Sequence, residues 1–150
     1  RSRRAGRPGP GTPPSAPRCP ATTRRESARG RPEPTSSVPA AAPVLPCQDV
    51  DAAIDYYKNK LGFDKTWVHQ GFYGGAYNGS AEFHFHKAQS EIHPIIVYCF
   101  VDKVDDVYEF VKSNGVEITN ELTNQVYGLR DFTIKDLNGH FISFASQIEK

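Results

Sequence analysis

Residues 50–58 read VDAAIDYYK and are followed by Gly62, and residues 104–112 read VDDVYEFVK and are followed by Gly115. Both stretches open on Val-Asp, close on Lys and carry an acidic residue followed by an aromatic one near their ends. The offset is 54 residues at the start and 53 residues at the glycine. A repeat of this size indicates that one supersecondary unit is used twice.

Each copy has the pattern of a short helix. Apolar residues recur at helical spacing in both: Val50, Ala53, Ile54, Tyr57 and Leu61, then Val104, Val107, Tyr108 and Val111. Asp49 and Asp102 precede the copies, and we expect both to be N-caps because a short carboxylate accepts the free N–H groups of a first turn. Gly62 and Gly115 stand where a left-handed residue would end each helix.

Strands are predicted on both sides of each helix. They are residues 43–47, 63–70, 71–77 and 81–87 around the first copy, and 94–101, 116–121, 130–135 and 140–145 around the second. Residues 81–86 read AEFHFH and alternate as in a strand with one buried face. Asn78 and Gly79 predict a hairpin turn. The order predicts an α+β fold in which two βαβββ modules form a curled mixed sheet around a cleft, the kind of place where small ligands bind.

The charge of the chain is divided between two regions. Residues 1–42 hold nine Arg, two acidic residues, nine of the 12 prolines and no aromatic residue, whereas the remainder has a net charge of −6 and all 17 aromatic residues. A segment without aromatic side chains buries too little apolar surface to offset its chain entropy. We therefore expect a disordered, basic, Pro/Arg-rich tail over residues 1–40 and one folded domain over residues 41–148.

Composition also limits the partners. There is no apolar run of about 18 residues, so no membrane partner is expected. The basic tail can bind nucleic acid nonspecifically, and no specific nucleic acid partner is expected. Cys19, Cys47 and Cys99 are widely spaced and form no C-x-x-C pair, which favours a reduced, cytoplasmic setting.

Two groups of motifs carry a family resemblance. The first consists of residues 43–50 (PVLPCQDV), the pair Tyr56 and Tyr57, and residues 61–63 (LGF); the second consists of residues 127–132 (YGLRDF) and 135–140 (KDLNGH). Over about residues 41–146 the chain resembles the bleomycin-resistance branch of the glyoxalase/bleomycin-resistance/dioxygenase superfamily, also called the vicinal oxygen chelate superfamily. The βαβββ pairing is common to the whole superfamily and does not by itself define a chemistry.

The resemblance implies a homodimer that sequesters a small molecule and does not catalyse a reaction. In that branch the clefts lie at the dimer interface, and cationic, bleomycin-like antibiotics stack on aromatic side chains. By position, the resemblance implies the ligand-binding residues Trp67, Phe72, Tyr98, Phe100, Tyr127 and Arg130, with no catalytic residue and no cofactor. Packing alone explains any one of these aromatics about as well, and we expect Phe63, Phe110, Phe132, Phe141 and Phe144 in the core.

Charge and ring chemistry agree with such a ligand. Aromatic faces attract cations by roughly 0.5–2 kcal/mol per contact. The net charge of −6 outside the tail adds a long-range attraction for a planar cation.

The alternative is a metal-dependent lyase, isomerase or dioxygenase of the same superfamily, and a third hypothesis is a sensor built on the same cleft. Three of the four metal-ligand positions of the superfamily enzymes fall near Ala42, Ile96 and Ser143, which are poor ligands. The remaining strand offers Glu82, His84 and His86. On a straight strand these donors span about 13 Å, too far for one ion, so polarity of the surface or cleft is the favoured interpretation.

Overall fold

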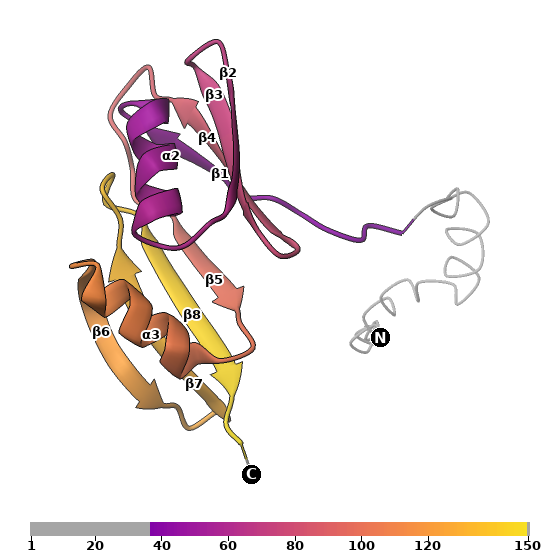
Figure 1. Cartoon of the computed structure of the whole chain (residues 1–150), viewed down its shortest axis with the longest axis vertical. Helices are drawn as coiled ribbons and strands as arrows, with labels where there is room; N and C mark the ends of the chain where they lie inside the picture. The colour runs from indigo at the N-terminus through magenta and orange to yellow at the C-terminus, as the bar shows by residue number, and fades with distance from the viewer. Residues whose placement is uncertain (1–36, 150) are drawn as a thin grey trace, which may run out of the picture. The chain divides into compact units, whose positions relative to one another are not determined.

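The computed structural model describes residues 37–149. The predicted tail therefore lies almost wholly outside the described residues, and its predicted disorder stays a prediction. The described elements are β1 (Val44–Cys47), α2 (Val50–Asn59), β2 (Lys65–His69), β3 (Tyr73–Asn78), β4 (Ala81–Lys87), β5 (Ile96–Phe100), α3 (Val104–Ser113), β6 (Glu117–Asn124), β7 (Leu129–Lys135) and β8 (Phe141–Gln147). This order confirms two βαβββ modules (Figure 1).

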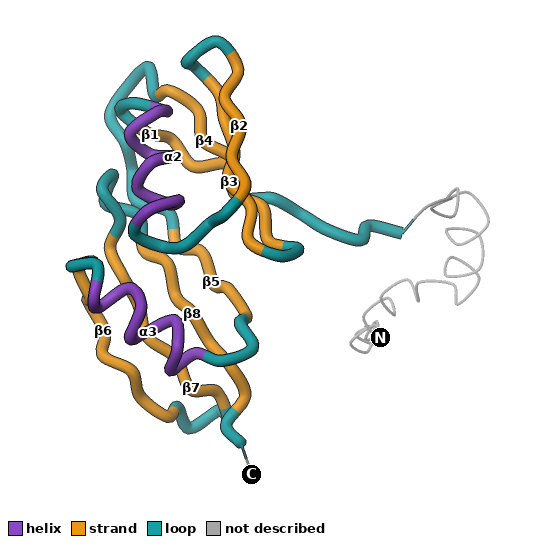
Figure 2. Tube along the Cα trace, viewed as in Figure 1, coloured by secondary structure: helices purple, strands orange, loops and turns teal. Residues whose placement is uncertain are grey.

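Each module is a mixed four-stranded sheet with one helix against it (Figure 2). The strand orders are β1-β4-β3-β2 and β5-β8-β7-β6. In each sheet the first strand pairs parallel to the last, and the other pairs are antiparallel. The predicted α+β class is confirmed, and both sheets are open, with β1 and β2 at the edges of one sheet and β5 and β6 at the edges of the other.

Helix α2 packs on the backbone of its sheet. Asp49 caps it as predicted, since Asp49 Oδ1 accepts a hydrogen bond of 2.8 Å from the Ala52 N–H. The side chains predicted to face inward are buried. A Cβ placed on Gly74 of β3 would lie 2.5 Å from Ile54 Cδ1 and 3.0 Å from Val50 Cγ1. Glycine at this position lets the helix side chains reach the strand backbone.

Helix α3 differs from two predictions. Its N-cap is Lys103, which makes no side-chain capping bond, so the prediction of Asp102 is wrong. Lys103 is extended, and this puts the Asp102 carboxylate one residue too early to reach the first turn. The core prediction is also wrong for Phe110, which is 46% exposed. Phe110 is two residues beyond the buried Tyr108, about 200° around the helix, and therefore points away from the sheet.

The other core predictions have mixed outcomes. Phe63, Phe132 and Phe144 are buried, whereas Phe141 is half-buried. The rings of Phe132 and Phe144 stack with centroids 5.4 Å apart, and Tyr108 meets Phe132 edge-on at 5.1 Å. Aromatic contacts between helix and sheet therefore form the core of the second module.

A buried histidine fastens the two modules together. His140 is fully buried, and its Nδ1 accepts a hydrogen bond of 3.0 Å from the Ile95 N–H, which leaves Nε2 as the protonated nitrogen. That Nε2 donates to the Pro46 carbonyl oxygen at 2.7 Å. Beside it, the buried Asp136 carboxylate accepts a hydrogen bond of 2.7 Å from the Tyr57 hydroxyl. The turn before β8 is thus bonded to both β1 and α2.

Candidate functional site

The site residues lie mainly on the sheet faces turned away from the helices. Because side chains alternate along a strand, the residues between the buried ones point to the opposite face. The strand register places Val44, His84, Gly75 and Trp67 in one row across the first sheet. It places Tyr98, Ser143, Thr133 and Asn120 in the corresponding row of the second. We call these surfaces the first open face and the second open face.

A hydrogen-bonded chain crosses the first open face. The Tyr73 hydroxyl lies 2.8 Å from His84 Nδ1, and His84 Nε2 lies 2.6 Å from Glu82 Oε1. The bond from His84 holds the pKa of the Glu82 carboxyl below its usual value. An ionised Glu82 can only accept, so His84 donates through Nε2, and its Nδ1 accepts the Tyr73 O–H in the neutral ring.

The Trp67 indole packs against the hydrogen-bonded side chains of Tyr73 and His84. Its ring centroid is 5.7 Å from Tyr73 and 5.4 Å from His84. A Cβ placed on Gly75 would lie 2.5 Å from Trp67 Nε1, so glycine at position 75 leaves the space that the indole occupies. The indole N–H is buried without a hydrogen bond of normal geometry. His84 first, then Tyr77, and least the Trp67 indole lower the pKa of the Glu82 carboxyl.

The second open face is organised around Asp131, a residue that the sequence analysis did not single out. Asp131 is only 7% exposed. Its Oδ2 accepts hydrogen bonds from the hydroxyls of Tyr98 at 2.7 Å and Tyr127 at 2.8 Å. Its Oδ1 accepts one from Gln125 Nε2 at 2.7 Å. Burial acts to raise the pKa of Asp131, but the three hydrogen bonds outweigh it and the pKa is lowered.

Large apolar side chains on this face are exposed. The exposed fractions are 75% for Ile96, 75% for Phe100, 61% for Tyr127 and 40% for Tyr98. The rings of Tyr98 and Phe100 meet edge-on with centroids 5.5 Å apart. Of the predicted binding residues, the structure therefore brings Tyr98, Phe100 and Tyr127 to one surface. Contiguous exposed apolar side chains of this kind mark interaction surfaces.

The remaining predicted residues lie elsewhere. Trp67 belongs to the first open face, and Phe72 lies in the β2–β3 turn, exposed, with its ring 5.5 Å from His69. Arg130 has the same strand parity as Phe132 and faces α3, where its guanidinium binds Asp105 at 2.9 Å and Asn124 at 3.0 Å. Arg130 is thus on the opposite side of the sheet from Tyr98.

The superfamily's metal-ligand set does not fit this chain. Ile96 is apolar, and Ser143 is buried with its hydroxyl 2.8 Å from Thr133 Oγ1. Glu82 is committed to His84. Over residues 37–149, no three His, Cys, Asp or Glu side chains gather closely enough to hold a metal ion. We derive no metal step from these residues.

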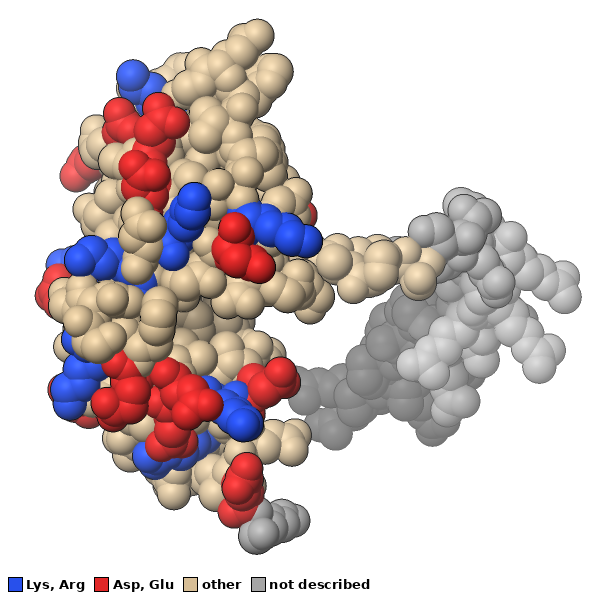
Figure 3. Space-filling view, in the orientation of Figure 1, with Lys and Arg blue, Asp and Glu red and all other residues tan. Residues whose placement is uncertain are grey.

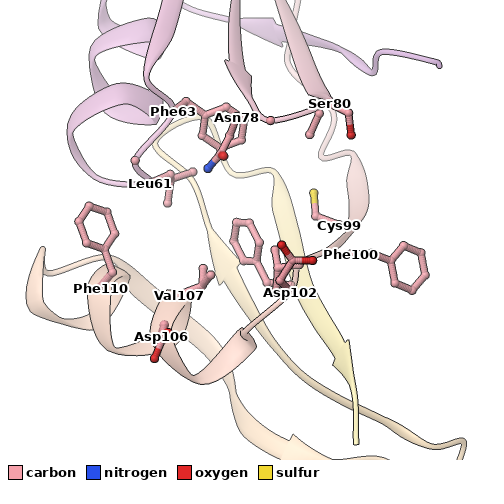
Figure 4. A pocket seen from close by; sticks show the side chains of 15 residues that line it. Leu61, Phe63, Asn78, Ser80, Cys99, Phe100, Asp102, Asp106, Val107 and Phe110 are labelled. Atoms are coloured by element: carbon pink, nitrogen blue, oxygen red, sulfur yellow. The ribbon is translucent and has the colours of Figure 1, made fainter. Parts of the chain in front are cut away.

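A separate cavity of about 490 Å³ lies between the modules, on the helix side (Figure 4). Leu61, Phe63, Val107 and Phe110 supply apolar walls, and Asp102 adds a carboxylate to the lining. Of the predicted binding residues, only Phe100 borders it, and the Phe100 ring points away from it (Figure 4). Burial raises the pKa of the Cys99 thiol in this cavity to about 12, so the thiol is not a nucleophile at neutral pH.

The two-module architecture corresponds to a known class. The sequence model of the family described as "Glyoxalase/Bleomycin resistance protein/Dioxygenase superfamily" matches residues 40–144 of this chain. The chain therefore belongs to this superfamily. No curated protein matches the sequence. Neither described helix is long and apolar enough to cross a membrane.

Solved structures of the same fold include proteins with different roles. TioX from Micromonospora sp. ML1 is 19% identical, with a TM-score of 0.66 over 74% of this chain and 100% of that one. The bleomycin-binding protein from the bleomycin-producing Streptomyces verticillus, complexed with copper(II)-bleomycin, is 19% identical, with a TM-score of 0.64 over 76% and 99%. A glyoxalase-related enzyme from Clostridium phytofermentans is 22% identical, with a TM-score of 0.65 over 77% and 100%. These likenesses show the fold, and the fold hosts both binding proteins and enzymes.

Proposed function

We propose that this protein sequesters a planar, cationic small molecule of the bleomycin type and does not transform it. The observation that carries the proposal is the second open face, where Tyr98, Phe100 and Tyr127 are exposed together. Aromatic rings offer large contact areas at a low cost in conformational entropy, and their faces attract cations. The likeness to a bleomycin-binding protein agrees with this class of ligand.

Charge supports the choice of a cation. Residues 43–150 have a net charge of −6. Figure 3 shows acidic side chains gathered over the α2 and α3 regions, where the sequence has Asp51 and Asp55 in α2 and Asp105, Asp106 and Glu109 in α3. A negative field over the domain speeds the encounter with a positively charged ligand, and added salt screens it.

The proposal includes a homodimer in which a second copy completes the cleft. The exposed apolar side chains of the second open face would then face a partner and the ligand instead of water alone. We expect a dimer by light scattering at micromolar concentration. A monomeric mass would remove the dimer from the proposal and leave the aromatic face to be tested by itself.

Ligand titration tests the binding function directly. We expect bleomycin to quench or shift the fluorescence of Trp67, the only tryptophan of the chain. Tyr98→Leu should weaken binding by about 1–3 kcal/mol, the typical value of one stacked aromatic. Trp67 lies on the first open face, so Trp67→Ala should have a similar effect through the proposed dimer, in which the first open face of the partner closes the cleft. Because Trp67→Ala lacks the reporter, calorimetry measures the variants. His84→Ala should weaken binding less, because it removes no large stacking face. If neither bleomycin nor any other planar cation binds, the binding function is wrong.

The alternative is a metal-dependent lyase, isomerase or dioxygenase. The observation in its favour is that Glu82 and His84, two side chains with metal-donor atoms, lie next to each other on β4, the last strand of the first module; a metal ion would have to replace the hydrogen bond between them. Metal analysis of the purified protein separates the two functions. The sequestration proposal expects no stoichiometric metal and unchanged affinity after chelation. Stoichiometric metal together with turnover that His84→Ala abolishes would establish the enzyme.

A further inference from the structure

We propose that Asp131 is a positioning residue that holds Tyr98 and Tyr127 as a preformed two-ring platform, and that this platform selects a planar cation over a neutral molecule of the same shape. The inference rests on the proposed function and names the subsite and the residue that give it its charge preference. It concerns one protomer, so it does not depend on the dimer.

The geometry indicates that the Asp131 carboxylate holds the two tyrosines in place and does not itself contact the ligand. Both oxygens of Asp131 are engaged, Oδ2 by two phenols and Oδ1 by Gln125. Asp131 is 7% exposed, whereas the two tyrosines whose hydroxyls it binds are 40% exposed (Tyr98) and 61% exposed (Tyr127). A ligand on the ring faces therefore meets the two tyrosines, while Asp131 acts through them.

The fold does not require a carboxylate at this position. The core of the second module lies on the opposite face of β7, where Phe132 and Ile134 are fully buried. Burying a charge is costly unless it is hydrogen-bonded. At the corresponding register position of the first module the residue is Tyr73, which pairs with His86 as Asp131 pairs with Ala145. One module thus folds without a carboxylate here, which points to a role for Asp131 outside folding.

The shared oxygen fixes the two rings relative to each other. An exposed tyrosine side chain normally rotates among its rotamers, and ordering it on binding lowers the affinity. Here Tyr98 comes from β5 and Tyr127 from the turn before β7, yet both hydroxyls meet on Asp131 Oδ2. The rotational freedom is restricted before a ligand arrives, as effective binding sites require.

The buried anion explains the preference for a cation. The three hydrogen bonds keep the pKa of Asp131 low, so the carboxylate is ionised at neutral pH. Its charge lies in a partly desolvated region, where electrostatic attraction is stronger than in bulk water. A cation on the ring faces gains both the ring quadrupole and this charge, whereas a neutral ring of the same shape gains only the stacking.

The test compares N-methylquinolinium with 2-methylquinoline at pH 8, where the second molecule is neutral. We expect the wild-type dissociation constant, measured by NMR titration, to be about tenfold lower for the cation. Asp131→Asn keeps the shape and removes the charge, so it should weaken binding of the cation about threefold and reduce the preference to the part that the ring quadrupole alone supplies. Asp105→Asn is the matched control, because it removes an exposed carboxylate on the helix face of the same module and should keep the preference.

A second measurement separates positioning from charge alone. The Tyr98→Phe/Tyr127→Phe double variant keeps both rings and loses both hydrogen bonds to Asp131. Its aromatic ring NMR signals should show more motion than those of the wild type, with weaker binding of both probes. Burial and then the bond to Asp131 raise the pKa of Tyr98, so Asp131→Asn should also lower the pH at which Tyr98 ionises.

The outcomes distinguish the two proposals. If each probe has the same dissociation constant for the wild type as for Asp131→Asn, the role of Asp131 is refuted while an aromatic binding function stands. If the wild type binds neither probe nor bleomycin, both are refuted. If Asp131→Asn does not fold, the double phenylalanine variant decides: rings as ordered as in the wild type and unchanged affinities refute positioning.

Discussion

The two modules have one backbone design and two different open faces. In corresponding rows, the first sheet carries Val44, His84, Gly75 and Trp67, and the second carries Tyr98, Ser143, Thr133 and Asn120. The large aromatic side chain of the first row is Trp67 on the edge strand β2, whereas that of the second row is Tyr98 on the edge strand β5. The duplication thus preserved strand pairing while the side chains that face away from the helices diverged.

The two open faces also differ in where their acidic side chain lies and how it is hydrogen-bonded. On the first face Tyr73 and His84 relay hydrogen bonds to Glu82, which is only half-buried. On the second face the anion itself, Asp131, occupies the position that corresponds to Tyr73, and it is buried beneath two tyrosines. A preformed binding surface for a cation is therefore expected on the second face.

The helix side differs as well. Gly74 pairs with Phe85 under α2, and at the same register position Phe132 pairs with Phe144 under α3. In the first module, Ile54 and Val50 of the helix occupy the space above Gly74. In the second module, the side chain of Phe132 on the sheet occupies the equivalent space and packs against Tyr108 of the helix. This contrast predicts opposite sensitivities to substitution.

The largest expected effect on stability comes from removing the Phe132 side chain from the core of the second module. Phe132→Ala should lower the free energy of unfolding by about 3–5 kcal/mol, since it opens a cavity between Phe144 and Tyr108. Phe110→Ala, in the same module but on an exposed side chain, should cost less than about 1.5 kcal/mol. Urea denaturation of both variants measures the difference, and equal costs would show that Phe110 supports the core after all.

The next effect is overpacking in the first module. Gly74→Ala should destabilise by about 1–3 kcal/mol, because the new Cβ would lie 2.5 Å from Ile54 Cδ1 and 2.9 Å from the Trp67 carbonyl oxygen. Gly75→Ala is the internal comparison, since its Cβ meets the Trp67 indole on the open face. It should change the Trp67 emission more than Gly74→Ala does. An unshifted spectrum in Gly75→Ala would mean that the indole does not lie over that glycine.

Much of the fold was predictable because its causes are local. Strand alternation, the helical stripes and the Asp49 cap depend on residues within a few positions of one another, and all three appear as predicted. Asp102 and Phe110 were misassigned because one extended residue, Lys103, and the rotation of α3 decide their surroundings.

The site was less predictable because it depends on register. Tyr98, Gln125 and Tyr127 meet Asp131 only after β5, β8 and β7 pair in that order. A weak sequence indication existed: Asp131 lies next to Phe132 in an alternating strand, so a carboxylate had to face the surface opposite the core. His140 is a similar case, since its partners Ile95 and Pro46 are far away in the sequence.

Acid titration sharpens the electrostatic comparison. The pKa of Asp131 is lowered from 3.8, so its hydrogen bonds add stability that is fully present above about pH 5 and is lost as the pH falls through the lowered pKa. Asp131→Asn should therefore be less stable than the wild type by about 1–2 kcal/mol at neutral pH, and the two should converge at low pH. A stability difference that stays constant between about pH 7 and pH 2 would contradict the ionised, hydrogen-bonded Asp131.

The smallest effect is expected at Arg130, and it tests which face of the second sheet binds the ligand. Arg130 is on the helix face, paired with the exposed Asp105, whereas Tyr98 is on the open face. An exposed ion pair contributes about 0–1 kcal/mol, so Arg130→Ala should change stability by no more than that. Its affinity for a planar cation should match that of the wild type or rise slightly, because a positive charge has been removed. A marked loss of affinity in Arg130→Ala, with stability unchanged, would place the binding surface on the helix side and break the contrast on which the second open face was chosen.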